Sequence, residues 1–294
     1  MEIVADYHTH TRYSHGRGTV EDNVRAALAR GLEAVGIADH GPRSWPWIRA
    51  TADGLRAMQR DVARVRARVP GLRVLAGVEA NVVTPEGDLD VPADLLSSLD
   101  LVIVALHPTV LPPTLRDAWR LLGPHYAARG WPSPRVRARA REVATRALVQ
   151  AVLRHSVDIV AHPGWGFDVD TRELARACAG RGTALELSAG HEHMTVEYCR
   201  IAAREGALFS LGSDAHAPER VGDLDRAVAL ARAAGVGPEQ VVGARGGPDL
   251  PRRAAAATGR PAGRGGSEIR QEGGERGRTS EVTVSPPGSG TAPR

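Results

Sequence analysis

Short apolar runs alternate with amphipathic segments along most of the chain. The runs are apolar at several consecutive positions, as expected of parallel strands that are covered on both faces. Seven of them stand out: Ile3–Tyr7, Ala34–Ala38, Val74–Val78, Leu101–Leu106, Asp158–Ala161, Ala184–Leu187 and Ala207–Leu211. The longest uninterrupted apolar run, Leu101–Leu106, is far shorter than the roughly 20 residues that span a bilayer, so no membrane segment is expected.

The segments between these runs carry helical patterns with recognisable ends. After Thr19, apolar residues recur every fourth position until Gly31, which ends the predicted helix. A starting threonine and a closing glycine recur at residues 171–180 and 195–206, and a longer amphipathic stretch covers residues 136–152. Alternating strands and helices predict a parallel sheet in an α/β protein. Seven strands favour an incomplete (β/α) barrel, although the pattern alone also leaves an open sheet in play.

Charge and composition set residues 245–294 apart from the rest of the chain. Nine of the 38 basic and five of the 34 acidic residues lie there, so residues 1–244 hold 29 of each sign and are neutral. The neutral part gives no argument for a nucleic-acid face. The last segment also has 11 Gly, 6 Pro and no aromatic residue. We therefore expect one domain at residues 1–244 and a disordered tail at 245–294, whose basic character could touch RNA or DNA although its acids dilute it.

Cysteine usage and the N-terminus bear on the cellular compartment. Cys178 and Cys199 lie in helix-like segments without the spacing of metal ligands, and two cysteines cannot form a disulfide framework. The residues after Met1 lack a basic region followed by an apolar stretch. These features predict a cytoplasmic protein. The sequence does not predict its oligomeric state.

Side chains that bind metals follow the carboxyl ends of six of the seven predicted strands. They are His8, His10, His15, His40, Glu79, His107, His162, Asp214 and His216. This edge is where the active sites of β/α barrels lie. One such histidine alone would be an ordinary buried residue, but nine ligand-type side chains at one edge indicate a metal centre. Because zinc is satisfied by four ligands, this set fits two or three ions, with Glu79 bridging.

The motifs that contain these residues resemble those of the PHP (polymerase and histidinol phosphatase) family over roughly residues 3–243. They are His8-Thr9-His10, Tyr13-Ser14-His15-Gly16, Ala38-Asp39-His40-Gly41-Pro42, His107, Ala161-His162-Pro163-Gly164 and Gly212-Ser213-Asp214-Ala215-His216. The stretches Gly77-Val78-Glu79-Ala80-Asn81 and Glu86-Gly87-Asp88-Leu89-Asp90 are most similar to those of YcdX-type bacterial phosphatases. The resemblance implies a distorted (β/α)7 barrel with three divalent metal ions, usually zinc and sometimes manganese or iron.

The resemblance also implies how the ligands divide among three ions. His8, His10, Glu79 and Asp214 would hold the first metal. Glu79, His107 and His162 would hold the second metal, and His15, His40 and His216 the third. We assign catalytic roles to Glu79, as the bridging ligand, and to Asp39, beside His40, as the residue that orients a ligand imidazole.

Candidate substrate-binding residues lie in the same loops. Arg12, Arg17 and Arg43 could clamp a phosphate, and Ser188 and His191 follow the sixth strand. Compared with compact phosphatases of this type, the chain has an insertion between His107 and His162 that is rich in arginine. Its arginines form either a solvated helix face or an anion-gathering lid: Arg116, Arg120, Arg129, Arg135, Arg137, Arg139 and Arg141.

Three functions fit these residues. We favour a metal-dependent phosphomonoesterase for small phosphate esters, such as a histidinol-phosphate-type substrate, in which hydroxide bridging the first two metals attacks phosphorus. The second is a phosphodiesterase or 3′-5′ exonuclease on nucleic acid, which the neutral domain makes weaker. The third is a non-catalytic interaction module, against which the complete ligand set argues.

Overall fold

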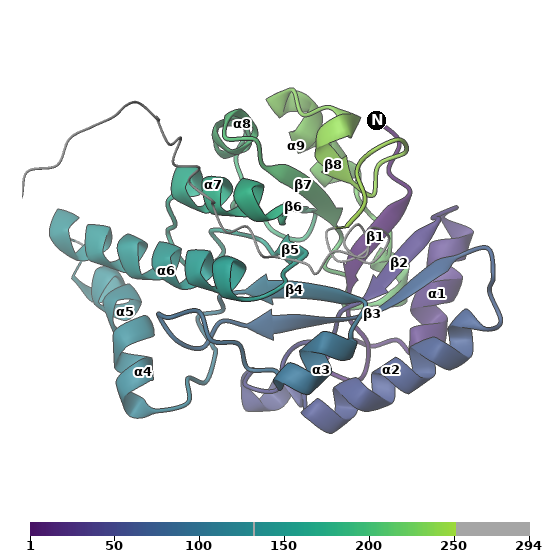
Figure 1. Cartoon of the computed structure of the whole chain (residues 1–294), viewed down its shortest axis with the longest axis horizontal. Helices are drawn as coiled ribbons and strands as arrows, with labels where there is room; N and C mark the ends of the chain where they lie inside the picture. Colours follow the sequence, from purple (N-terminus) through teal and green to yellow (C-terminus); the bar gives the residue numbers. More distant parts are fainter. Residues whose placement is uncertain (132, 251–294) are drawn as a thin grey trace, which may run out of the picture. The chain divides into compact units, whose positions relative to one another are not determined.

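Eight strands form one curled, barrel-like parallel sheet in the computed structural model, which describes residues 1–131 and 133–250 (Figure 1). Each strand pairs in parallel with its neighbour in the sequence. The strands are β1 (Ala5–Thr9), β2 (Ala34–Ile37), β3 (Arg73–Asn81), β4 (Leu101–Ala105), β5 (Ile159–Val160), β6 (Ala184–Ser188), β7 (Leu208–Gly212) and β8 (Val241–Val242).

The seven predicted strands are confirmed as β1 to β7, and with them the α/β barrel of the PHP type. Strand β8 was not predicted, because its two residues carry no recognisable pattern. It extends the sheet beyond β7 toward the N-terminal segment. There the amide of Val4 donates to the carbonyl of Gly243 at 2.8 Å, and Ile3 forms an antiparallel bridge with Ala244.

Nine α-helices cover the described sheet. They are α1 (Val20–Ala29), α2 (Ala52–Arg66), α3 (Ala93–Ser98), α4 (Leu115–Leu121), α5 (Gly123–Gly130), α6 (Pro134–Arg154), α7 (Thr171–Arg181), α8 (Val196–Arg204) and α9 (Asp225–Ala234). Short 3₁₀ helices occupy Pro46–Ile48, Pro218–Arg220 and Pro238–Gln240. Thr19 caps α1 as predicted, in a capping box with Asp22. The residue that caps α7 is Asp170, whose side chain accepts a hydrogen bond from the amide of Glu173. Thr171 is the first residue of the helix itself.

Alternate strand residues enter different parts of the core. Leu101, Ile103 and Ala105 of β4 belong to a cluster of strand residues inside the curled sheet. Val102 and Val104 belong to a cluster outside it, together with α6, α7 and α8. This alternation follows from the two-residue period of a strand, and burial on both faces explains why the predicted runs are continuously apolar.

The insertion between β4 and β5 forms three helices, α4, α5 and α6, that lie together on one side of the molecule (Figure 1). The second half of α6 buries Val143, Leu148 and Val152 in the outer core. Helix α4 leaves large apolar side chains in solvent, because Leu115 is 91% and Trp119 78% exposed. The insertion is therefore anchored through α6.

Residues 245–250 pack on the body, although the predicted tail begins at 245. Arg245 forms ion pairs with Glu2 and Glu33 at 2.8 Å. Leu250 is fully buried in the cluster inside the sheet. The rest of the predicted tail, 251–294, lies outside the described residues. Among the helices of the part that the structure describes, none has the length and apolar character needed to cross a bilayer.

Candidate metal centre

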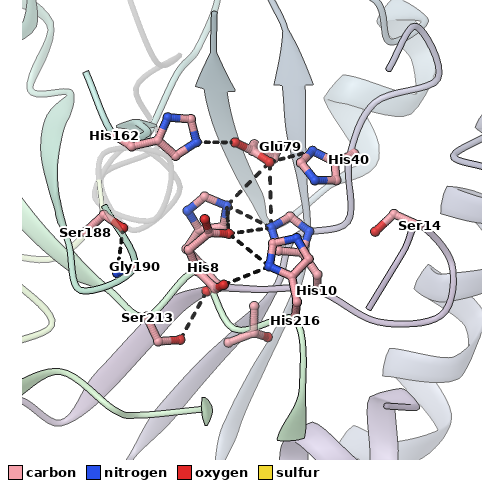
Figure 2. A network of polar contacts seen from close by, with 12 residues as sticks. His8, His10, Ser14, His40, Glu79, His162, Ser188, Gly190, Ser213 and His216 are labelled. Carbon is pink, nitrogen blue, oxygen red and sulfur yellow. Dashed lines mark hydrogen bonds and ion pairs between the residues drawn. The ribbon is translucent and has the colours of Figure 1, made fainter. Parts of the chain in front are cut away.

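The nine predicted metal ligands come together at the carboxyl-terminal edge of the sheet. Figure 2 shows Glu79 between His162 and His40, with His8, His10 and His216 close by. The division predicted from the sequence defines three sets. The first donor group is His8, His10, Glu79 and Asp214; the second donor group is Glu79, His107 and His162; the third donor group is His15, His40 and His216. Among the described residues, the donor atoms that lie close enough together to hold one ion form other sets: His8, His10 and Asp214; His10, His40 and His216; His40, Glu79 and His107; and His162, His191 and Asp214.

The first donor group has the spacing of a metal site. Five separations among the Nε2 atoms of His8 and His10, Oε2 of Glu79 and Oδ1 of Asp214 lie between 3.0 and 3.7 Å. Donor atoms bound at about 2.0–2.1 Å to a tetrahedral zinc ion are about 3.4 Å apart. The donor atoms of His8, His10 and Asp214 therefore lie close enough to share one such ion, and Glu79 Oε2 lies 3.5 and 3.7 Å from the two imidazoles.

Glu79 faces two donor groups with its two carboxylate oxygens. Its Oε2 belongs to the first donor group, whereas its Oε1 lies 3.2 Å from His107 Nε2 and 2.8 Å from His162 Nε2. The side chain is fully buried at the end of β3. This geometry fits the bridging role predicted for Glu79.

The third donor group lies directly beside the first. The ring centroids of His15 lie 4.9 Å from His40 and 4.2 Å from His216. The ring of His10 stacks on both His40 and His216, at 4.4 and 4.3 Å. His15 comes from the loop after β1 and His216 from the loop after β7, so residues 201 positions apart meet here.

Several buried donor atoms in the cluster have no hydrogen-bond partner among the described residues. Besides His10 Nδ1, they are the three atoms Glu79 Oε2, His40 Nδ1 and His216 Nε2. The first two lie 2.7 Å apart, but not in the geometry of a hydrogen bond. A buried polar atom left unpaired costs about 1–3 kcal/mol. Divalent ions would satisfy all three atoms, so the residues present fit a metal cluster.

Burial and neighbouring charges shift the pKa values of the donors in different directions. Burial, with help from neighbouring imidazoles, lowers the pKa of His10 well below its usual value and that of His15 to about 4. Burial alone would raise the pKa values of Glu79 and Asp214, but the surrounding histidines hold both well below the usual range. Burial opposes protonation of His8 and His162, but nearby carboxylates, Glu186 and Glu79 among them, raise the pKa of both imidazoles, so metal ions would compete with protons for these two ligands.

Two ligand-type residues have unusual backbone conformations. His162 and Asp214 have φ angles of 27° and 51°, in the left-handed region that residues other than glycine rarely adopt. Such strain costs about 1–3 kcal/mol and persists where the surrounding structure enforces it, most often at functional sites. At both strand ends, this turn directs the side chain into the cluster.

Two residues that the sequence analysis missed hold the imidazoles in place. Glu186 Oε1 lies 2.7 Å from His8 Nδ1, and its Oε2 accepts a hydrogen bond from the amide of His162 at 2.8 Å. Asn81 Oδ1 lies 2.7 Å from His107 Nδ1. Each contact fixes one ring nitrogen and leaves Nε2 free for a metal. The sequence did contain a signal for Glu186, because this charged residue stands between Leu185 and Leu187 in an apolar strand.

Asp39 makes its hydrogen bonds with the loop after β1. Its carboxylate accepts hydrogen bonds from the amide of Thr11 at 2.8 Å and the hydroxyl of Ser14 at 2.6 Å. Burial raises its pKa. Asp39 therefore holds the loop that carries His10 and His15, and the predicted contact with a ligand imidazole is not found among its hydrogen bonds.

The predicted substrate-binding residues divide into two sets. Arg12, Arg17 and Arg43 are exposed and do not line the cavity beside the cluster. Ser188 is buried and accepts a hydrogen bond from the Gly190 amide at 3.1 Å. His191 does line the cavity, and its Nε2 lies 2.9 Å from Asp214 Oδ2.

The cavity beside the cluster has a volume of about 450 Å³. Its wall includes ligands of all three donor groups, together with Asn81, Thr109, Trp47 and Trp165. None of the described arginines of the insertion is part of this wall. Arg120 instead pairs with Glu86, and Arg141 with Asp170. The structure thus supports the solvated alternative for these arginines rather than an anion-gathering lid.

Comparisons with known proteins point to one family. The model of the PHP domain matches residues 6–164. A "Probable phosphatase" of Shewanella sp. (strain ANA-3) is 30% identical over 244 residues, which cover 79% of this chain and 84% of the relative. A "Probable phosphatase" of Edwardsiella ictaluri is 32% identical over 250 residues, covering 81% and 89%.

Solved structures share the fold. The histidinol phosphate phosphatase of Lactococcus lactis, crystallised with zinc, L-histidinol and phosphate, has a TM-score of 0.58 and 18% identity, covering 81% of this chain and 95% of its own. A putative histidinol phosphatase of Listeria monocytogenes has a TM-score of 0.57 and 15% identity, covering 74% and 97%.

Proposed function

The chain belongs to the PHP domain family and is a metal-dependent phosphoesterase, and we propose that it hydrolyses small phosphate monoesters at a site for three divalent ions. The observation that carries this proposal is the position of Glu79, whose two oxygens face two different sets of imidazoles. Esters of the histidinol phosphate type are candidate substrates, because the Lactococcus lactis neighbour was crystallised with L-histidinol and phosphate.

Each donor group would hold one ion. Seven imidazoles and two carboxylates form the complete set, and this nitrogen-rich composition suits zinc, with manganese or iron as alternatives. When bound, such ions would lower the pKa of water to near neutral, so that it can attack phosphorus, and would screen the negative charge of the phosphate.

The chain's own residues prepare the site for this chemistry. Glu79 keeps the first and second donor groups at a fixed separation, because one rigid carboxylate belongs to both. Glu186 holds the Nδ1 proton of His8, so that His8 presents Nε2 to the first donor group. Ligands that are already in position do not have to move when negative charge develops on the phosphate, so no free energy is spent on reorganising them.

Two observations favour monoesters over nucleic acid. Residues 1–244 have no net charge, whereas proteins that track a nucleic-acid backbone carry clustered basic side chains. The cavity wall contains no arginine among the described residues that form it, and the chain has no lysine. Phosphate binding is therefore left to the metal centre, which suits a small ester with one phosphate.

The test is turnover by metal-loaded protein on p-nitrophenyl phosphate, bis-p-nitrophenyl phosphate and labelled single-stranded DNA. We expect the monoester to be hydrolysed fastest. Glu79→Gln should abolish turnover and lower the metal content, because Glu79 belongs to two donor groups. The exposed Glu197→Gln serves as the matched control and should behave as wild type.

Faster cleavage of the diester or of DNA would replace this proposal with a nuclease. Absence of turnover despite full metal occupancy would indicate a non-catalytic module.

A further inference from the structure

Two indoles line the cavity beside the metal ligands, Trp47 and Trp165. We propose that they form the subsite for the alcohol part of the substrate, and that this subsite selects singly phosphorylated esters of flat ring alcohols. This inference rests on the proposed function and specifies its substrate class.

Trp165 lies directly against the imidazoles of the site. Its ring centroid lies 5.3 Å from that of His107 and 5.5 Å from that of His162, in edge-to-face arrangements of 75° and 68°. The ring of His191 lies 5.1 Å away on the same loop cluster. A phosphate held between the donor groups would therefore have this indole as its immediate neighbour.

The loop that carries Trp165 is fixed by its backbone. The amide of Trp165 donates to the carbonyl of His162 at 3.0 Å. Gly164 and Gly166, on either side, have φ angles of 99° and 75°, which side-chain-bearing residues rarely adopt. A Cβ at Gly166 would lie 2.4 Å from Pro108, next to the ligand His107. Trp165 is thus held in place before a substrate arrives, which reduces the entropy lost on binding.

Trp47 provides a second aromatic surface on the cavity wall. It belongs to the 3₁₀ helix Pro46–Ile48 in the connection that follows His40. Its side chain contacts Trp45, with a ring-centroid distance of 4.9 Å, yet it remains 63% exposed. Ile48, its neighbour, also lines the cavity. An indole left this exposed beside a ligand site offers apolar area that a flat ring can cover.

The charge of the cavity limits the substrate to one phosphate. The described residues that line it include the carboxylate of Asp214 but no arginine. The guanidinium of Arg43, from the loop after His40, instead donates to the carbonyl of Leu111 at 3.4 Å. A second phosphate on the alcohol would enter this cavity without a cationic side chain to compensate for lost hydration. Esters with two phosphates should be poor substrates.

Three phosphate esters of primary alcohols test the subsite. They are benzyl phosphate, n-propyl phosphate and the bisphosphate of benzene-1,4-dimethanol. All three release a primary alcohol as the leaving group, so differences in rate report on binding of the alcohol part. We expect wild-type protein to have a kcat/KM for benzyl phosphate roughly tenfold above that for either of the other two, since an aromatic contact of about 1.4 kcal/mol corresponds to tenfold.

Variants of the indoles make the test specific. Trp165→Ala and Trp47→Ala should lower kcat/KM for benzyl phosphate by roughly five- to tenfold and that for propyl phosphate by less than about twofold. The inhibition constant of inorganic phosphate and the metal content should stay unchanged. Trp165→Phe should restore most of the preference. Trp119→Ala is the control, because that indole is exposed on α4 and does not line this cavity.

The outcomes separate this inference from the proposed function. Equal treatment of benzyl and propyl phosphate by wild type, or an equal loss for both esters in Trp165→Ala, would overturn the subsite and leave a monoesterase. Efficient hydrolysis of the bisphosphate would overturn the charge argument. Failure of metal-loaded wild type to hydrolyse any monoester would overturn the proposed function itself.

Discussion

Glu79 and Glu186 are both buried carboxylates, but they contact the histidines from different sides. Glu79 faces the Nε2 atoms of His8, His107 and His162 and the Nδ1 atom of His40, whereas Glu186 contacts His8 at Nδ1 and His162 at its amide. Glu186 thereby links a residue of the first donor group to one of the second. Gly212 leaves space for this arrangement, because a Cβ there would lie 2.0 Å from Glu186 Oε1.

Replacing Glu186 by Gln should weaken zinc binding by roughly 10- to 100-fold, because it removes the charge that orients and strengthens the His8 imidazole. The measurement is chelator competition, together with the visible spectrum of the cobalt-substituted protein, which reports ligand geometry. Glu197→Gln, at an exposed position, should match wild type. Unchanged affinity and spectrum in Glu186→Gln would show that Glu186 has no influence on the metal ligands.

At the scale of single residues, the sequence predicted the donors better than their supports. The nine ligand-type side chains were found because they lie within or after the carboxyl-terminal part of a strand, and the apolar runs of the strands are visible in the sequence. The contact between His8 and Glu186 joins residues 178 positions apart and depends on the folded sheet. The hydrogen bonds of Asp39 also depend on the fold: it adjoins His40 in sequence, but its hydrogen bonds go to Thr11 and Ser14.

At the scale of elements, the loop after β3 supports a ligand of the next strand. Asp90 accepts hydrogen bonds from the amides of Asn81 and Arg43 at 2.8 and 2.9 Å and from the side chain of Asn81 at 2.6 Å. Asn81 in turn contacts His107. The loop, the end of β3 and the ligand after β4 are therefore one connected unit.

Asp90 predicts a pH effect on stability. Burial raises its pKa to about 6 from the model-compound value of 3.8, so the folded state binds this proton more tightly than the unfolded state. Ionised Asp90 therefore reduces stability above pH 6, and this penalty is lost as the pH falls toward 4. Measured by urea unfolding, the stability of wild type relative to Asp90→Asn should rise between pH 7 and pH 4 by up to about 3 kcal/mol.

The control for this comparison is Asp53→Asn, whose side chain is 96% exposed. Its stability relative to wild type should change little over the same pH range. A difference between wild type and Asp90→Asn that stays constant with pH would contradict the assignment.

Secondary structure was predictable where burial is uniform. Strands β1 to β7 are almost entirely buried and most of their residues are apolar, so their sequences stand out, whereas β8 is only two residues long. Helix α7 starts at Thr171 as predicted, but the residue that caps it is Asp170. Aspartate and threonine can both accept the capping hydrogen bond, so the sequence alone does not choose between adjacent residues of these types.

For the whole molecule, the C-terminal boundary of the packed body is decided by residues 245–250. Arg245 pairs with Glu2 and Glu33, and Leu250 fills the interior of the sheet. Composition did not reveal this, because one leucine and one arginine in a Gly/Pro-rich segment give no pattern.

Two truncations test this boundary. A chain of residues 1–250 should keep wild-type turnover, since every donor lies between His8 and His216. A chain of residues 1–244 loses the buried Leu250, which costs about 2–3 kcal/mol and should lower Tm in calorimetry by roughly 5–10 °C. Equal Tm values for the two truncations would show that residues 245–250 add nothing to stability.

The central claim is that side chains from opposite ends of the sequence enclose three divalent ions around Glu79. Anomalous diffraction at the zinc edge, from crystals of protein purified without chelators, tests it most directly. We expect three peaks, two of them within bonding distance of Glu79 and the third among His15, His40 and His216. A fully folded protein with no peak at these side chains, or with peaks only elsewhere, would contradict the claim.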